Sequence, residues 1–273
     1  MTQGNRRLEG KVAIVTGAGS SGPGVGNGKA TATLFAREGA KVLLVDADLG
    51  RAEETLSLIR KEGGEASVFR ANVTKAEDCL RMVEETMERY GRLDILDNNV
   101  GISRRGTVVE VSEEDWDQVM EVNVKSIMLA SRYAIPSMVQ SGGGSIINIS
   151  SIAGIRAHRS TPYSASKAAV IGLTFSMAGD HGKDNVRVNC IAPGLVYTPM
   201  VAPRMDDALR QRRREAAPLG TEGTAWDVAW AAVYLASDES RWVTGIVIPV
   251  DAGLSVTTPA TYSPLAQQQY QRL

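Results

Sequence analysis

Short runs of aliphatic and β-branched residues alternate with amphipathic segments along most of the chain, and this alternation constrains the fold most. Several runs are apolar throughout, as expected for parallel strands covered on both faces. The expected strands are residues 12–16, 42–46, 67–71, 95–99, 145–150, 186–191 and 246–250. The expected helices are residues 29–38, 49–62, 76–90, 113–140, 163–179 and 225–237. The pattern predicts an α/β fold: a doubly wound, seven-stranded parallel sheet with helices on both faces.

No Pro-rich or charge-rich linker divides the 273 residues, which predicts one domain over 1–273 with a core from 8 to 253. Residues 194–223 interrupt the alternation with a polar segment punctuated by prolines. In an open α/β sheet the ligand crevice lies at the carboxyl ends of the strands, so this segment is expected to be a substrate lid. The alternative is a surface helix pair without a gating role. The tail, 254–273, is expected to fray or to pack on a partner subunit.

Composition excludes several classes of function. Thirty Lys and Arg nearly balance 31 Asp and Glu, which argues against nucleic acid or an anionic membrane as a partner. Cys79 and Cys190 lack metal-site spacing and are expected to be reduced, buried thiols, and His158 and His181 show no zinc pattern, so no metal is expected. No apolar run approaches the ~20 residues of a membrane span, and the first residues lack a signal-peptide core. We therefore expect a cytoplasmic protein.

A glycine-rich stretch joins the first expected strand to the first expected helix. Residues 16–30 read TGAGSSGPGVGNGKA, with a G-x-G-x-x-G match that begins at Gly17 and a G-x-x-x-G-x-G match that begins at Gly22. Free backbone N–H groups and the helix dipole at such a junction favour a pyrophosphate, and glycines let the backbone approach it. A G-x-G-x-x-G match alone is weak evidence, because glycine-rich turns without a ligand are common.

An acid at the end of the second expected strand strengthens the prediction of a dinucleotide site. Asp46 closes the run VLLVD, where a carboxylate can accept both hydroxyls of the adenosine ribose and repel the 2′-phosphate of NADP. The sequence therefore predicts NAD as the cofactor in preference to NADP. Lys29 and Arg37 are the cations nearby in sequence that would favour NADP instead.

Six motifs fall in the order typical of one family. They are TGAG at 16–19, NNVG at 98–101, Asn123 in EVNVKS, Ser150 and Ser151 in IINISS, Tyr163 and Lys167 in YSASK, and PGLVYTP at 193–199. From Leu8 to Gly253 the chain resembles the short-chain dehydrogenases/reductases, single-domain Rossmann-fold oxidoreductases that use NAD(P). The resemblance departs at the glycine loop, usually T-G-x-x-x-G-x-G, which here is lengthened by about five residues around 20–25. Gly17 with Gly26 or Gly28 is expected to hold the cofactor, and Pro23 and the middle glycines to form a bulge over it.

Tyr163 and Lys167 are four residues apart, so they share one face of a helix. A free tyrosine, with a pKa near ~10, is a poor base at neutral pH, and a nearby ammonium lowers that pKa. The pair is therefore expected to carry general acid–base chemistry. The alternative is a packed aromatic residue beside a solvated lysine.

The resemblance implies further catalytic roles. Lys167 would also hold the nicotinamide ribose, Ser151 would bond the substrate oxygen, and Asn123 would hold a water that relays protons to Lys167. Ser150 has the more usual spacing to Tyr163, but the motif favours Ser151. Asp97 stands where the family often has an aliphatic residue, and it is expected either to pair with a base or to lie close to the cofactor.

The resemblance also implies cofactor contacts. Asn72 and Val73 would flank the adenine, Asn99 and Gly101 would line the ribose and crevice, and the PGLVYTP segment would meet the carboxamide and phosphates. The full set of expected cofactor contacts is Gly17, Ser20, Ser21, Gly26, Asn27, Gly28, Asp46, Asn72, Val73, Asn99, Gly101, Tyr163, Lys167, Pro193, Gly194, Val196 and Thr198. Basic residues after the fourth and fifth strands would suit an anionic substrate, or are merely solvated or at subunit contacts: Arg104, Arg105, Arg156, His158 and Arg159.

These observations predict hydride transfer between NAD(H) and a secondary alcohol or ketone. One alternative is an NADPH-dependent reductase of 3-oxoacyl thioesters, against which Asp46 and the near-neutral charge count. Another is a non-catalytic redox sensor, against which the intact Ser151, Tyr163 and Lys167 count. The resemblance implies a homotetramer or homodimer, and the apolar helices around 116–138 and 170–177 would suit its contacts.

Overall fold

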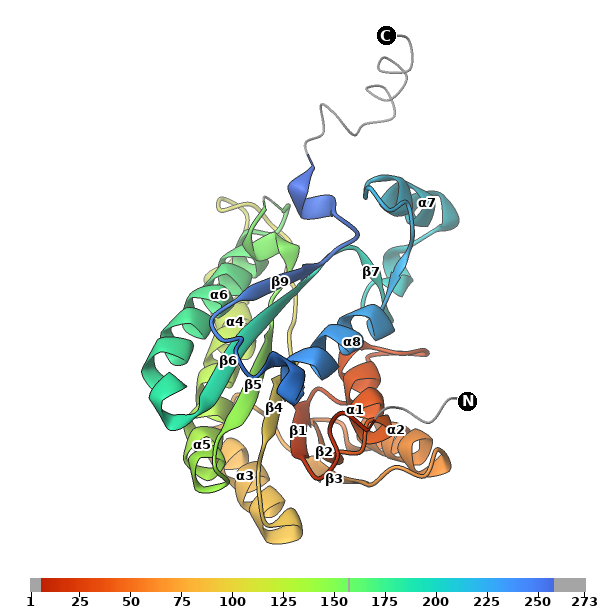
Figure 1. Cartoon of the computed structure of the whole chain (residues 1–273). Helices are drawn as coiled ribbons and strands as arrows, with labels where there is room; N and C mark the ends of the chain where they lie inside the picture. Colours follow the sequence, from red (N-terminus) through yellow and green to blue (C-terminus); the bar gives the residue numbers. More distant parts are fainter. Residues whose placement is uncertain (1–5, 157, 258–273) are drawn as a thin grey trace.

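The computed structural model describes residues 6–156 and 158–257. Its main sheet has seven parallel strands in the order β3-β2-β1-β4-β5-β6-β9 (Figure 1). They are β1 (Val12–Thr16), β2 (Lys41–Asp46), β3 (Ala66–Arg70), β4 (Ile95–Asn98), β5 (Gly144–Ile149), β6 (Val186–Pro193) and β9 (Val247–Val250). Every expected strand is present with ends shifted by no more than two residues, which confirms the predicted fold class.

Helices cover both faces of this sheet (Figure 1). On one face lie α1 (Asn27–Arg37), α2 (Leu49–Lys61) and α8 (Ala225–Ala236). On the other lie α3 (Ala76–Tyr90), α5 (Ser126–Gln140) and α6 (Thr161–His181). Successive residues of β1 serve the two cores: Ala13 and Val15 belong to the first and Ile14 to the second. Both faces of a central strand are buried, which is why its sequence is apolar throughout.

The strand order reverses direction at β1. The chain moves from β1 outward to β2 and β3, then crosses to β4 on the other side of β1. At such a switch point the loops that leave the two strands separate in opposite directions, so a crevice opens at the carboxyl ends of β1 and β4. The glycine loop and the NNVG motif therefore line this crevice.

The long helix expected over 113–140 is interrupted. The structure has α4 (Glu113–Met120), a π-helical turn (Glu121–Lys125) and then α5. A π-helical turn accommodates one extra residue in a helix and is frequent at functional sites. Here it holds Asn123, whose side chain is fully buried.

Residues 194–223 form a separate group of short elements. β7 (Val196–Tyr197) pairs with β8 (Gly223–Thr224), and α7 (Asp207–Glu215) lies between them in sequence. Figure 1 shows α7 standing beyond the main sheet. Arg210 of α7 forms two hydrogen bonds to Glu222, at 3.0 and 2.6 Å, and its guanidinium lies 4.0 Å from the ring centroid of Tyr197. The segment thus has internal contacts of its own, and its role as a lid stays a prediction. All but the first four residues of the expected tail lie outside the described residues.

Candidate active site

Tyr163 and Lys167 lie together on α6. The Lys167 ammonium nitrogen is 5.7 Å from the centroid of the Tyr163 ring. Lys167 is buried, and its Nζ donates to the backbone oxygen of Ile149, the last residue of β5, at 2.8 Å. Burial lowers the pKa of Lys167 to about 8, so the side chain still carries its charge at neutral pH. A cation is thus fixed between β5 and α6, beside the phenol.

Two adjacent serines at the end of β5 point in different directions. The Ser150 hydroxyl is buried and donates to the backbone oxygen of Lys167 at 2.7 Å, which ties β5 to α6. The Ser151 hydroxyl accepts from Ala153 N at 3.1 Å. It also forms a hydrogen bond with Tyr163, which works to lower the pKa of the phenol. Alternation along the strand therefore leaves Ser151, and not Ser150, beside the tyrosine.

The acidity of Tyr163 differs from the sequence expectation. Burial raises the pKa of the phenol, and the hydrogen bond from Ser151 only partly opposes this increase. In the protein alone the pKa of Tyr163 is therefore not lowered below that of a free tyrosine, because the effect of burial is the larger one. The phenol is therefore protonated at neutral pH.

The Asn123 side chain joins the loop after β4 to α6. Its amide nitrogen donates to Ile102 O and to Ser166 Oγ, both at 2.9 Å, and its oxygen accepts from Ile102 N at 2.8 Å. Ser166 Oγ in turn donates to the backbone oxygen of Tyr163 at 2.8 Å. Sequence reasoning missed Ser166, although its position three residues after Tyr163 puts it on nearly the same helical face. The expected water relay through Asn123 stays a prediction.

A second series of buried, hydrogen-bonded side chains lies beneath the site, and sequence reasoning missed it as well. Asn98 Nδ2 donates to Asn148 Oδ1 at 2.9 Å, and Asn148 Nδ2 donates to Thr174 Oγ1 at 3.0 Å. These three side chains link β4, β5 and α6 through the core. They hold the strand ends that carry the crevice in fixed relative positions.

The glycine loop folds closely onto the end of β1. A Cβ on Gly28 would lie 2.0 Å from the Gly17 carbonyl oxygen, and Gly17 has a positive φ of 64°. Gly26 N donates to the Ser20 hydroxyl at 2.9 Å, whereas Ser21 is exposed. Gly26, the N-cap of α1, offers no side-chain acceptor to the first turn, so its N–H groups suit a pyrophosphate. The pairing of Gly17 with Gly28 thus explains which glycines the turn requires.

Asp46 stands at the tip of β2, against the glycine loop. Its Oδ2 accepts from Gly19 N and its Oδ1 accepts from Asp48 N, both at 3.0 Å. The two cations that argued for NADP are engaged elsewhere, because Lys29 lies 3.5 Å from Glu54 and Arg37 lies 2.7 Å from Glu62.

Two other arginines lie near this carboxylate, although Arg51 also pairs with Asp48 at 3.1 Å. A Cβ on Gly19 would lie 2.5 Å from Arg51 Cβ and 3.0 Å from Asp46 Oδ2. Arg70, paired with Asp46 in the β2–β3 register, donates to Ala47 O at 3.2 Å. Sequence reasoning missed both, because the position of Arg70 depends on the register of β2 and β3, and the approach of Arg51 to Gly19 depends on how the glycine loop folds.

The remaining expected contacts lie at the strand ends. A Cβ on Gly194 would lie 2.5 Å from Asp251 Cβ, so this position requires glycine, whereas one on Gly101 would lie 3.2 Å from Lys167 Nζ, a tighter but not impossible approach. Asn72, just past β3, is exposed, and its side-chain oxygen accepts from Thr74 N and Oγ1. The others, near the ends of β3, β4, β6 and β7 and at the start of α1, are Asn27, Val73, Asn99, Pro193, Val196 and Thr198.

Asp97 is fully buried in β4, between Val15 of β1 and Ile147 of β5. Its Oδ2 accepts from Asn99 Nδ2 at 2.9 Å, and its Oδ1 has no hydrogen-bond partner in the described part of the chain. The partner is an amide, so the expected pairing with a base is wrong. Burial raises the pKa of Asp97 to about 7.

This carboxyl makes stability depend on pH. Because its pKa is raised in the folded state, the folded chain binds more protons than the unfolded chain between about pH 4 and 7, and stability falls as pH rises through this range. The loss is on the order of 3–4 kcal/mol. We expect Asp97→Asn to remove it, so the variant gains unfolding free energy relative to the native protein between pH 5 and pH 8 in denaturant titrations. An equal difference at both pH values would contradict this.

The arginines considered for an anionic substrate are not equivalent. Arg104 pairs with Asp115 at 2.9 Å and donates to Gln118, and Arg156 donates to Ser255 O. Arg105 and Arg159 are exposed and form no ion pair within residues 6–156 and 158–257. An anionic substrate stays a prediction, and Arg105 and Arg159 are now the arginines that would bind it.

The remaining expectations concern the two cysteines, a metal site and a membrane span. Cys79 and Cys190 are buried free thiols, and burial raises the pKa of each to about 11. Among the described residues no cluster of three or more His, Cys, Asp or Glu is suited to a metal. No helix in this part of the chain is both long and apolar enough to cross a membrane.

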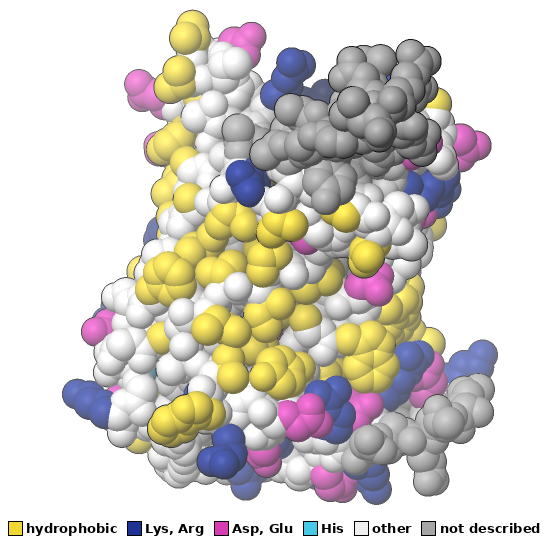
Figure 2. Space-filling model, turned by 45° about the horizontal axis from the view of Figure 1, so that its top comes forward, with side chains coloured by type: hydrophobic (Ala, Val, Ile, Leu, Met, Phe, Trp, Pro, Cys, Tyr) yellow, Lys and Arg dark blue, Asp and Glu magenta, His cyan; other side chains and the backbone are white. Residues whose placement is uncertain are grey.

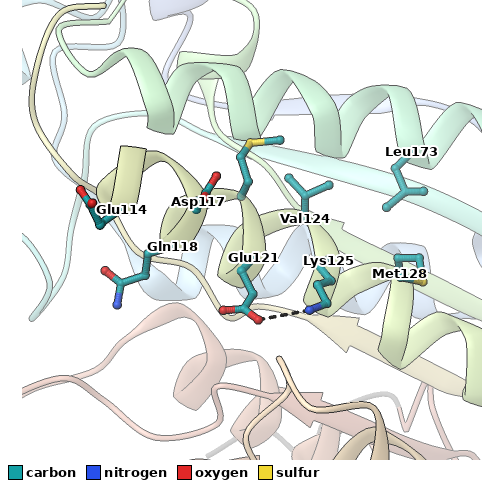
Figure 3. Close-up of a pocket in the computed structure, with 9 residues that line it drawn as sticks. Glu114, Asp117, Gln118, Glu121, Val124, Lys125, Met128 and Leu173 are labelled. Atoms are coloured by element: carbon teal, nitrogen blue, oxygen red, sulfur yellow. Dashed lines mark hydrogen bonds and ion pairs between the residues drawn. The ribbon is translucent and has the colours of Figure 1, made fainter. Parts of the chain in front are cut away.

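A shallow hollow on the outer surface of α4 and α5 lies apart from these residues (Figure 3). Glu121 and Lys125 form an ion pair of 3.2 Å across it, next to Val124, Met128 and Leu173. None of the expected catalytic or cofactor residues lines it. This hollow is therefore not the candidate active site.

Comparisons with known proteins agree with this fold. A family model described as enoyl-(acyl carrier protein) reductase matches residues 24–255. The 3-oxoacyl-[acyl-carrier-protein] reductase FabG of Thermotoga maritima is 41% identical over 251 residues, which cover 92% of this chain and 100% of that protein.

Two solved structures are also similar. A short-chain dehydrogenase/reductase from Burkholderia xenovorans superposes with a TM-score of 0.88 at 43% identity, covering 92% of this chain and 99% of the other. A 7α-hydroxysteroid dehydrogenase complexed with NADH and 7-oxo glycochenodeoxycholic acid has a TM-score of 0.86 at 34% identity, covering 91% and 96%. The chain belongs to the short-chain dehydrogenase/reductase family. It is an oxidoreductase that acts on CH–OH groups and the corresponding ketones.

Proposed function

We propose that this enzyme transfers hydride between NAD(H) and a secondary alcohol or ketone, with Tyr163 as the general acid and base. The observation that carries the proposal is the arrangement of three side chains at the ends of β5 and α6. Lys167 Nζ lies 5.7 Å from the centroid of the Tyr163 ring, and Ser151 forms a hydrogen bond with the same phenol. These groups can bind a carbonyl oxygen and move a proton to it.

A nicotinamide dinucleotide held at the glycine loop and Lys167 would supply the hydride for ketone reduction. Ser151 donates a hydrogen bond to the carbonyl oxygen, where negative charge develops. Tyr163 then gives its proton to that oxygen, and its raised pKa keeps the proton available at neutral pH. The Lys167 ammonium stabilises the phenolate that remains. Ser150 and Ser166 position α6 through their bonds to the backbone of Lys167 and Tyr163.

The preference for NAD rests on Asp46. A carboxylate at the end of β2 accepts bonds from ribose hydroxyls and repels a 2′-phosphate. Lys29 and Arg37 are the cations that would favour NADP. Because they pair with Glu54 and Glu62, they are not free to bind a 2′-phosphate.

A second candidate is the reduction of a 3-oxoacyl thioester with NADPH. It is favoured by the similarity to the Thermotoga maritima reductase and by the proximity of Arg51 to Asp46. The redox-sensor alternative has less support, because a sensor has no need of Ser151, Tyr163 and Lys167 together.

The function is tested by following NADH and NADPH absorbance with a panel of ketones. The panel contains a neutral cyclic ketone, a steroid ketone, a β-ketoester and a 3-oxoacyl thioester. We expect oxidation of NADH by at least one ketone that is not a thioester. Turnover of the thioester alone, with NADPH, would establish the second candidate instead.

We also propose a homodimer or homotetramer. Figure 2 shows hydrophobic side chains gathered over the middle of one face. Large apolar side chains are exposed on α4, α5, α6 and α8 and near β9, among them Trp116, Met128, Phe175, Trp230, Trp242 and Ile246. Gathered apolar side chains on a surface mark interaction sites, so subunit contacts would cover those on this face. Location in the cytoplasm stays a prediction.

A further inference from the structure

The glycine loop contains a segment that the close turn itself does not require. Without residues 21–25, the stretch reads T-G-A-G-S-G-N-G, which has the T-G-x-x-x-G-x-G spacing of the family. The structure holds the two ends of this segment together, because Ser20 Oγ accepts from Gly26 N at 2.9 Å and Ser20 is buried. Residues 21–25 therefore form a closed excursion, and the turn from β1 into α1 is complete without them.

This excursion has a partner on the far side of the crevice. A Cβ on Gly22 would lie 3.8 Å from Pro199 Cβ, and a Cβ on Gly24 would lie 3.4 Å from Pro199 Cγ. Both are ordinary van der Waals distances for an added methyl group, so the two glycines face the proline ring with room for about one methyl group between them. Gly24 has a φ of 112°, a conformation that other residues rarely adopt.

The contact joins loops that the sheet keeps apart. The excursion follows β1, and Pro199 follows β6 and β7. In the sheet β4 and β5 lie between β1 and β6, which at ~4.8 Å per strand puts these two strand ends about 14 Å apart. A contact between their loops must therefore cross over the crevice at the carboxyl ends of β4 and β5.

We propose that residues 21–25 and Pro199 form a clasp over the pyrophosphate of the bound dinucleotide, and that the cofactor leaves only when this contact opens. The inference rests on the proposed function, because it needs a cofactor in the crevice. The apposition consists of a proline ring facing two glycines, with no ion pair or hydrogen bond between the two segments among the described residues. It can open at little cost, which suits a part that must release a product.

Pro199 is itself part of the expected lid, residues 194–223. It is the residue before Met200, at the start of the chain that leads to α7. When the lid segment moves, the proline is carried with it. The clasp therefore couples the release of cofactor to the position of residues 200–223.

The test measures NADH release from three variants. The first deletes residues 21–25, which leaves the family spacing and is expected to fold. The second is Pro199→Ala, which removes the ring atom next to Gly24. The third combines both changes. Pro203→Ala is the matched control, because Pro203 is exposed and lies four residues further along the same segment.

Stopped-flow displacement of NADH gives the dissociation rate, and equilibrium fluorescence gives the affinity. We expect the deletion and Pro199→Ala each to raise the dissociation rate about threefold or more, with association little changed. Because both act through one contact, the double variant is expected to match the deletion alone. Pro203→Ala is expected to release NADH at the native rate.

Native release rates in the deletion and in Pro199→Ala would overturn the clasp while leaving the proposed function intact. Additive effects in the double variant would also overturn it, since they mean that the two sites act independently. Failure of the native protein to bind NADH would instead contradict the proposed function, and the clasp with it.

Discussion

Replacing Tyr163 with phenylalanine is expected to lower kcat for ketone reduction by about 10³-fold, within the ~10²–10⁴ range typical of a lost general acid. The ring stays in place beside Lys167, but the proton for the carbonyl oxygen is gone. NADH affinity is expected to remain within about twofold of the native value, because the phenol hydroxyl contributes to chemistry more than to cofactor binding.

The measurement is steady-state kinetics with the best ketone of the panel, together with an NADH titration of the same variant. Tyr133→Phe is a suitable control, because it removes a hydroxyl from α5, on the same face of the sheet, and is expected to keep full activity. A loss of less than tenfold in Tyr163→Phe would show that the proton comes from another group.

Replacing Asp46 with serine is expected to reverse the cofactor preference. NADH affinity would fall about tenfold with the loss of the carboxylate that accepts from the ribose hydroxyls. NADPH affinity would rise at least as much, because the repulsion is removed and Arg51 is already close to this position.

Parallel titrations with NADH and NADPH measure both changes. Glu53→Gln is the control, because it removes one negative charge from an exposed position of α2 and leaves the ion pair of 3.1 Å between Asp48 and Arg51 in place. We expect this control to keep the NAD preference. A preference that is unchanged in Asp46→Ser would mean that the glycine loop, and not the acid, discriminates between the two cofactors.

Much of the fold follows from local pattern. The apolar runs marked all seven strands of the main sheet, because a central parallel strand has no polar face. The pairing of Tyr163 with Lys167 follows from a spacing of four residues on a helix, and it needs no knowledge of the rest of the molecule.

The features that escaped prediction depend on contacts between distant segments. The π-helical turn at Glu121–Lys125 adds one residue to a helix whose apolar face continues on both sides, so the pattern hides it. The raised pKa of Tyr163 comes from burial by several elements at once. The approach of Arg51 to Gly19 and that of Pro199 to Gly24 depend on the path of the glycine loop, which its sequence leaves open.

The most direct test of the proposed function is a fluorescence titration of the native protein with NADH and NADPH in parallel. We predict saturable binding of one NADH per chain, with an affinity at least about tenfold higher than that for NADPH. Tighter binding of NADPH would contradict the role of Asp46 and favour the thioester reductase. Absence of saturable binding of either nucleotide would contradict hydride transfer at this site altogether.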